Sequence, residues 1–362
     1  MKVNYYNISG TTFRFKDRKL SDADADELRQ HEEVVNNFYS FTTLRTHNDE
    51  TLYVGTTHMN SRLLWRFDIE TKQFEDLKYD KVAREGDVKI HRSLEYDPQG
   101  DVFYLVSSAL HGEDKYYQSP GSAIYIFDPK TGTIEPIGTP LEHEYTQTIA
   151  FDSSRRLIYG FTYHTFSFYV FDVDKRETIF RAMPGSITHI SAIDDDGCVW
   201  GTWGRDLHYI YKYDPAKNDI VWTRKQFPEG GHSYMYPGAG PVDCMLNGQD
   251  GFLYIGLETG SLVRMDPRTV EFEYLGRPSP HPRMPAVVLA EDGLLYGTCG
   301  DDYNVSIFVF DRKNNGFKTI AKIETDDEQC FRPHDIAMIG DKIYVGETDH
   351  PQRTGYLWEI IR

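Results

Sequence analysis

The sequence predicts an all-β fold, a seven-bladed β-propeller built from four-stranded antiparallel blades. Two recurring features predict it: a short strand that ends in an aromatic residue and glycine, and a following strand that ends in an aromatic residue and aspartate. The aspartates stand at positions 68, 128, 172, 214, 266 and 311, at steps of 60, 44, 42, 52 and 45. Most steps match the roughly 40–50 residues of one propeller blade.

Seven copies of the unit can be counted. The second, around Tyr104-Leu105-Val106, lacks the glycine, and the seventh, Ile343 to Ile360, lacks the aromatic-Asp ending. Closing such an array radially protects sheet edges that an open array would expose, and a pair of β-sandwiches would not explain the regular period. The glycine-containing copies are Tyr53-Val54-Gly55, Tyr159-Gly160, Trp200-Gly201, Tyr254-Ile255-Gly256, Tyr296-Gly297 and Tyr344-Val345-Gly346.

Turn and strand signals complete each blade. Hairpin turns are expected at 97–100, 194–197, 249–251 and 291–293, where Asp and Gly residues cluster. Fourth strands are expected at 73–77, 133–137 and 317–323. Residues 3–15 alternate and are expected to form one or two strands. Since the seventh unit ends at Arg362 without a fourth strand, the N-terminal strand is expected to pair with the last blade and close the ring.

The N-terminal region holds the one helix-like stretch, Ser21 to Val35, with Ser or Asp as N-cap and acidic residues in the first turn. We therefore expect a single propeller domain over residues 1–362, in which residues 1–37 supply the closing strand and a short helical segment.

Composition excludes several classes of function. The net charge of −17 argues against a nucleic-acid partner, which needs a basic surface. No run of about 18 apolar residues predicts a membrane span. The N-terminus lacks the apolar core of a signal peptide, which predicts a cytoplasmic protein, or a periplasmic or secreted one if a signal has been removed. Four cysteines without CxxC spacing are expected to be reduced and buried.

The candidate site follows from the fold. In a propeller, the loops that lead into each first strand and out of each second strand share one face, the usual ligand site. Most of the 13 histidines fall at these positions, with several arginines. The longer loops 112–121 and 229–240 also belong there. The residues expected to bind substrate are Arg92, Tyr145, His164, His189, Arg205, His232, Arg283, Arg332 and His334.

A metal ion is the one cofactor considered. His334, Glu347, Asp349 and His350 are of ligand type and would lie together at the seventh blade, although their spacing is not diagnostic of a metal.

The positions of His91, His111 and Tyr163 resemble those of propeller-fold polysaccharide lyases of the ulvan lyase and rhamnosyl-glucuronate lyase type, and more distantly oligogalacturonate lyases. The resemblance implies β-elimination next to a uronic acid in an acidic oligosaccharide or polysaccharide. It implies that His91, His111 and Tyr163 are catalytic and that an arginine binds the uronate carboxylate, with Arg92, Arg205 and Arg332 as candidates.

Two other functions fit the same residues. One is a carbohydrate- or protein-binding propeller without catalysis, in which replacing His91 or His111 weakens binding and no turnover exists. The other is a metal-dependent lactonase or hydrolase, which predicts a bound divalent ion and loss of activity with a chelator.

Overall fold

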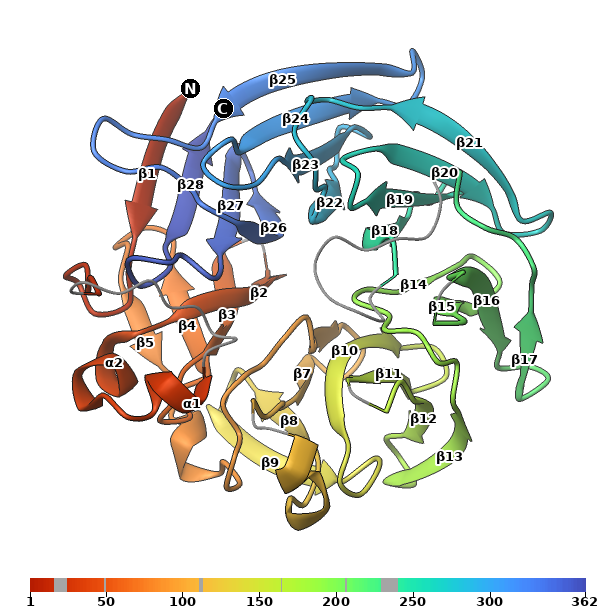
Figure 1. The fold of residues 1–362 in the computed structure, drawn as a ribbon, viewed down its shortest axis with the longest axis horizontal. Helices are drawn as coiled ribbons and strands as arrows, with labels where there is room; N and C mark the ends of the chain where they lie inside the picture. The colour runs from red at the N-terminus through yellow and green to blue at the C-terminus, as the bar shows by residue number, and fades with distance from the viewer. Residues whose placement is uncertain (16–24, 49, 111–112, 164, 206, 229–239) are drawn as a thin grey trace. The chain divides into compact units, whose positions relative to one another are not determined.

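The protein forms seven four-stranded antiparallel sheets, the blades of a β-propeller, as the sequence predicts (Figure 1). The structure is a computed structural model that describes residues 1–15, 25–48, 50–110, 113–163, 165–205, 207–228 and 240–362. Within those ranges, six sheets are each built from four strands that are consecutive in sequence, and the seventh combines β26, β27 and β28 with β1. No helix of the described residues is long and apolar enough to cross a membrane.

The chain divides into two compact units. The first comprises Met1–Tyr145, Asp301–Val305 and Ala321–Arg362, and the second comprises Thr146–Gly300 and Ser306–Ile320. That the whole chain behaves as one domain stays a prediction. The first unit holds α1 (Ala25–Leu28), α2 (Glu32–Asn37), the 3-10 helices Tyr79–Lys81 and Glu113–Gln118, β1 (Lys2–Tyr6), β2 (Ser40–His47), β3 (Thr51–Thr57), β4 (Leu64–Asp68), β5 (Phe74–Asp76), β6 (Leu94–Asp97), β7 (Val102–Val106), β8 (Ile124–Asp128), β9 (Thr133–Gly138), β26 (Pro333–Ile339), β27 (Lys342–Glu347) and β28 (Leu357–Ile361).

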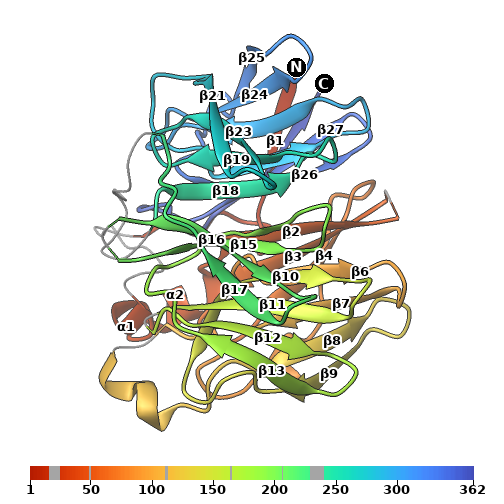
Figure 2. The same ribbon diagram turned by 90° about the vertical axis from the view of Figure 1, so that its right-hand side faces the viewer.

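The second unit holds four further sheets. In the sheet β10–β13 the strands lie side by side in both ribbon views (Figures 1 and 2). The strands that fall mainly in this unit are β10 (Tyr145–Asp152), β11 (Leu157–Tyr163), β12 (Phe168–Asp172), β13 (Glu177–Ala182), β14 (Ala192–Ile193), β15 (Val199–Trp203), β16 (Tyr209–Asp214), β17 (Asp219–Trp222), β18 (Val242–Asn247), β19 (Leu253–Leu257), β20 (Leu262–Asp266), β21 (Glu271–Gly276), β22 (Ala286–Leu289), β23 (Leu295–Cys299), β24 (Ser306–Asp311) and β25 (Gly316–Lys322).

The repeated sequence motif is explained by packing. A Cβ at Gly55 would lie 2.4 Å from Cγ2 of Thr43, and one at Gly160 would lie 2.0 Å from the Tyr169 ring, so only glycine fits there. The aspartate of the second motif caps a turn: Oδ1 of Asp68 accepts the backbone N–H groups of residues 70 and 71 at 2.9 and 2.8 Å. Both roles involve residues that are close together in the chain, so the same motif can serve one blade after another.

The N-terminal strand closes the seventh blade, as predicted. β1 pairs antiparallel with β28, from Lys2 opposite Ile361 to Tyr6 opposite Leu357, and the two chain ends lie near each other (Figure 1). Of residues 3–15, which are expected to form one or two strands, only 3–6 belong to a strand, because the chain turns at 8–10. Further on, Arg14 forms an isolated antiparallel bridge with Arg353.

The expected helix over Ser21 to Val35 is wrong in its extent. Among the described residues of this stretch the chain forms two short helices, α1 and α2, separated by a turn at 29–31, and residues 16–24 lie outside the description. His31 at the N-cap of α2 makes no side-chain capping bond, which leaves Glu32 and Glu33 to favour the positive end of the helix. The helices are held by burial of Leu28 and Val34 in a small apolar cluster.

All four cysteines, at 198, 244, 299 and 330, are buried and free, as the sequence predicts.

Candidate functional site

Two histidines from different blades meet in the first unit. His91 lies just before β6, and His334 is the second residue of β26; the first strands β26 and β6 both pack against β2. Nε2 of His91 lies 2.8 Å from Nε2 of His334, and the ring centroids are 4.6 Å apart at 76°. The exposed fractions are only 5% and 8%, so the pair is largely shielded from water.

The backbone around this histidine pair is specifically shaped. Arg92 adopts a left-handed conformation with φ of 44°, uncommon for a residue other than glycine, and its Nη2 donates to the backbone oxygen of His334 at 2.8 Å. The register of β26 against β27 shifts between Pro333 and Asp335, which re-aims His334. Arg92, a predicted substrate-binding residue, thus joins the two histidine-bearing segments and is itself buried.

The pair has a defined proton chemistry. A hydrogen bond between two imidazole Nε2 atoms needs one protonated nitrogen as donor and one with a free lone pair as acceptor. In a neutral pair, the ring that donates through Nε2 keeps its lone pair on Nδ1, and the ring that accepts at Nε2 carries its proton on Nδ1. The pair therefore offers one basic and one acidic nitrogen, on rings that are shielded from bulk water. Imidazole is the side chain whose ordinary pKa lies closest to neutrality, so such a pair can exchange roles during a reaction.

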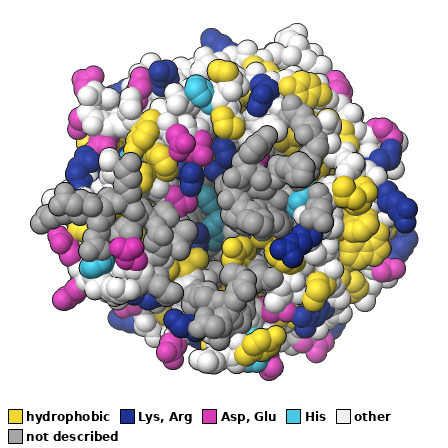
Figure 3. Space-filling model, in the orientation of Figure 1, with side chains coloured by type: hydrophobic (Ala, Val, Ile, Leu, Met, Phe, Trp, Pro, Cys, Tyr) yellow, Lys and Arg dark blue, Asp and Glu magenta, His cyan; other side chains and the backbone are white. Residues whose placement is uncertain are grey.

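Arg332 is the more accessible guanidinium near this pair. Its Nε lies 3.2 Å from Oδ1 of Asp301 and its Nη1 lies 3.5 Å from Oδ2 of Asp349, and 30% of the side chain is exposed. Both contacts are long for charge-assisted hydrogen bonds, which are usually about 2.7–2.9 Å. The face in Figure 3 likewise shows Lys and Arg side chains interspersed with Asp and Glu. Arg332 is therefore a partly exposed guanidinium that pairs with two carboxylates.

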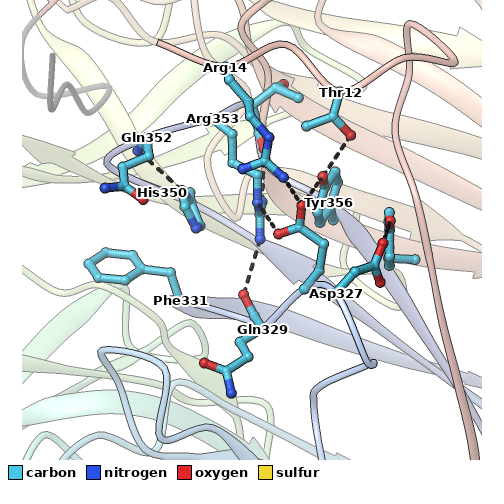
Figure 4. Close-up of polar contacts among 12 residues, drawn as sticks. Thr12, Arg14, Asp327, Gln329, Phe331, His350, Gln352, Arg353 and Tyr356 are labelled. Atoms are coloured by element: carbon cyan, nitrogen blue, oxygen red, sulfur yellow. Dashed lines mark hydrogen bonds and ion pairs between the residues drawn. The ribbon is translucent and has the colours of Figure 1, made fainter. Parts of the chain in front are cut away.

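Glu347, a predicted metal ligand, is instead committed to a buried ion pair. Its carboxylate is fully buried and binds Arg353 Nη1 at 2.8 Å and Nη2 at 3.1 Å. Arg353 also donates from Nε to Glu328 at 3.0 Å, and Figure 4 shows Arg14 and Tyr356 joined to the same network. This network ties the N-terminal segment to the last blade.

His350, another predicted metal ligand, forms a hydrogen bond within the protein. Its Nδ1 accepts the backbone N–H of Gln352 at 3.2 Å, and burial, with the charges of Arg353 and Arg14, lowers its pKa to about 3. Among the residues that the structure describes, no group of three or more His, Cys, Asp or Glu side chains is placed to hold a metal ion. His334 and Asp349 are engaged with His91 and Arg332 as described above.

The other predicted residues have diverse environments. The Tyr145 ring is buried against Ala109, and burial raises the pKa of its hydroxyl to about 12. In the second unit, Arg283 is buried and bonded through Nε and Nη2 to Asp243, both at 2.8 Å. Tyr163 ends β11, and His189 is buried and Arg205 exposed in the same unit. The predicted residues His111, His164 and His232 lie outside the described residues.

Two solved structures share this fold. Both are virginiamycin B lyase from Staphylococcus aureus. The selenomethionine-substituted enzyme has a TM-score of 0.63 at 14% identity, with 99% of each chain covered. A catalytically inactive histidine-to-alanine variant with quinupristin has a TM-score of 0.66 at 13% identity, covering 100% of this chain and 99% of that one. At such identity the likeness establishes the fold alone. No protein-family model and no curated protein sequence matches the chain.

The environment of His58, in the segment after β3, predicts acid sensitivity. The ring is 1% exposed and stacked on Tyr39 with centroids 4.2 Å apart, and burial lowers its pKa to about 4. Because the unfolded chain binds a proton near pH 6.5 and the folded one does not, stability falls as pH drops from about 6.5 through 4, by up to about 3 kcal/mol. Urea unfolding at pH 7 and pH 5 measures the loss.

The matching variant is His58→Asn, which keeps an acceptor for the Asn60 N–H that now binds Nδ1 at 3.1 Å but cannot titrate. We expect a shallower dependence of stability on pH in this variant. The control His281→Asn, at an exposed position, should follow the wild type. Identical pH dependences for His58→Asn and the wild type would contradict the assignment.

Proposed function

We propose that this protein is a lyase that breaks a carbon–oxygen bond by β-elimination, with His91 and His334 as its acid–base pair. The observation that carries the proposal is the shielded hydrogen bond of 2.8 Å between the two Nε2 atoms. A donor and an acceptor in contact suit a reaction that removes one proton and delivers another.

The reaction we propose is cleavage next to a uronic acid. The ring that keeps its lone pair on Nδ1 removes the proton on the carbon next to the carboxylate, and the electron pair of that C–H bond forms a carbon–carbon double bond. The glycosidic C–O bond at the neighbouring carbon breaks, and its oxygen takes up a proton from the acid. Positive charge at the carboxylate stabilises the negative charge that develops in the transition state.

Arg332 is the residue we propose for the carboxylate. Its side chain is 30% exposed, and a guanidinium favours a bidentate contact with a carboxylate. Arg92 is buried and holds His334, so it is a positioning residue. The resemblance to polysaccharide lyases adds His111 and Tyr163 as further acid–base groups in this proposal, with an acidic oligosaccharide or polysaccharide as substrate.

The names of the two solved structures support the reaction class. Both are lyases, and one is inactivated by replacing a histidine with alanine. They act on a different compound from the one proposed here, so virginiamycin B and quinupristin belong in the substrate panel beside uronate-containing saccharides.

The test is an ultraviolet scan for a conjugated unsaturated product. Wild-type protein is mixed with oligogalacturonate, ulvan and rhamnose–glucuronate oligosaccharides, and product masses are measured in parallel because simple elimination conserves total mass without adding water. An absorbance rise with fragments that sum to the substrate mass is expected. Fragments whose masses include an added water would show hydrolysis and not elimination, which would overturn the proposal. A flat absorbance trace over the full panel would also overturn it.

A further inference from the structure

Three segments contribute to an aromatic cluster formed by Tyr303, which lies between β23 and β24, Phe331, which lies just before β26, and His350, which follows β27. The ring centroids of Tyr303 and Phe331 are 5.1 Å apart, and those of Tyr303 and His350 are 5.7 Å apart. Phe331 and His350 are 5.6 Å apart and lie side by side in Figure 4. All three residues belong to the first unit, and Phe331 precedes His334 by three residues.

In the aromatic cluster the Tyr303 ring is exposed, and the backbone at this position is strained. Tyr303 is 41% exposed, although its N–H donates to the backbone oxygen of Phe331 at 3.4 Å and fixes its place. It has φ of 67°, and Asp302 before it has φ of 49°. Two successive non-glycine residues in the left-handed region are strained, and such strain collects at functional positions.

His350 supplies a fixed hydrogen-bond donor. Since Nδ1 accepts the N–H of Gln352, the neutral ring carries its proton on Nε2. The low pKa of this imidazole keeps it neutral at physiological pH. Among the described residues no acceptor for Nε2 is found, and the Tyr303 hydroxyl likewise makes no hydrogen bond there.

The charge beside the aromatic cluster is mixed. Asp301 and Asp349 pair with Arg332, whose guanidinium carbon is 5.2 Å from the centre of the Phe331 ring. A ligand group that sits on the aromatic rings therefore lies next to the group that Arg332 binds and meets the neutral imidazole of His350, which suits an uncharged group.

We propose that Tyr303, Phe331 and His350 form a subsite for an uncharged pyranose ring, which stacks on the exposed aromatic surface and accepts a hydrogen bond from Nε2 of His350. A pyranose offers an apolar face of C–H groups and oxygen atoms at its edge, the combination that this cluster complements. The proposal rests on the lyase function, because it places a neutral sugar beside the uronate that Arg332 would hold.

The experiment measures binding of three tetrasaccharides by titration calorimetry: xylotetraose, tetragalacturonate, and an alternating rhamnose–glucuronate tetrasaccharide, with quinupristin as a non-sugar probe. The alternating compound should bind most tightly to the wild type. Tyr303→Asn removes the ring and places at positive φ a residue that tolerates it. This change should weaken binding about tenfold, whereas Tyr303→Phe, which keeps the ring, should stay within about threefold.

Two further variants sharpen the test. His350→Asn keeps an acceptor for Gln352 and removes the Nε2 donor, and should weaken binding about fivefold. The control is Tyr274→Asn in β21 of the second unit, where a tyrosine of similar exposure, 48%, should be replaceable without effect. Melting temperatures of all variants show that the fold is kept.

The outcomes separate this proposal from the lyase function. The subsite is overturned if the wild type binds tetragalacturonate more tightly than both xylotetraose and the alternating tetrasaccharide. It is also overturned if Tyr303→Asn and the wild type bind the alternating tetrasaccharide equally well. Loss of quinupristin binding in Tyr303→Asn, with no saccharide bound by the wild type, assigns the aromatic rings to a non-sugar ligand and also overturns it. Ring-dependent saccharide binding without any unsaturated product supports the subsite and overturns the lyase. Product formation with an unchanged KM in Tyr303→Asn supports the lyase and overturns the subsite.

Discussion

His91→Ala and His334→Ala are each expected to lower kcat about 10²–10⁴-fold on the substrate that the ultraviolet screen identifies, the usual range for removal of an acid–base catalyst. KM should change little, because neither ring needs to contribute to ground-state binding. Since the two imidazoles act through one shared hydrogen bond, the double variant should be about as slow as the slower single variant. Steady-state kinetics with a check of melting temperature measures these effects.

The control for the histidine pair is His281→Ala, which removes an exposed imidazole in the second unit and should leave kcat unaltered. If His91→Ala or His334→Ala keeps activity within threefold of the wild type while folded, the pair is structural and the acid–base groups lie elsewhere. Multiplicative losses in the double variant would show instead that the two rings act independently.

Arg353→Met is expected to destabilise the protein by about 3–5 kcal/mol, the usual cost of leaving the partner of a buried ion pair uncompensated. Arg353 and Glu347 are fully buried, and the guanidinium also satisfies Glu328 and lies 3.7 Å from the centre of the Tyr356 ring. Removing it leaves the buried Glu347 carboxylate without its ion-pair partner where the N-terminal segment joins the last blade, whereas Glu328 keeps its contacts with Arg14 and Tyr356. Chemical unfolding at pH 7 measures the loss.

The matched control is Arg268→Met in the second unit. Arg268 pairs with Asp266 at 3.0 Å, but it is exposed, so solvent screens the interaction and little change in stability is expected. Replacing Arg353 and Glu347 together by Met and Gln should recover part of the loss, because the double change removes both charges of the pair. Equal effects of Arg353→Met and Arg268→Met would contradict a structural role for the buried network.

The fold was predictable because its signals are local. The glycine of each repeat is required where a neighbouring side chain packs on the backbone, as Thr43 does at Gly55. The aspartate binds N–H groups two and three residues ahead, as Asp68 does. Both requirements recur at the period of a blade, so the sequence alone predicts seven blades and the need for a closing strand.

The errors near the N-terminus have tertiary causes. Alternation over residues 3–15 predicted strand, but only Lys2–Tyr6 pairs with β28, where the partner edge is available. The predicted helix breaks at 29–31 because short helices depend on burial of residues such as Leu28 and Val34 more than on propensity.

The sequence by itself determined the fold class, the order of the blades and the pairing of the first strand with the last. Only the tertiary structure decided that His91 meets His334, 243 residues away, that Glu347 faces Arg353, and that Tyr303 joins Phe331 and His350. The physical reason is that blade periodicity depends on contacts between near neighbours in the chain. Proton transfer and charge pairing depend on distances of about 3 Å between side chains from different segments of the chain, which the spacing of residues along a sequence does not fix.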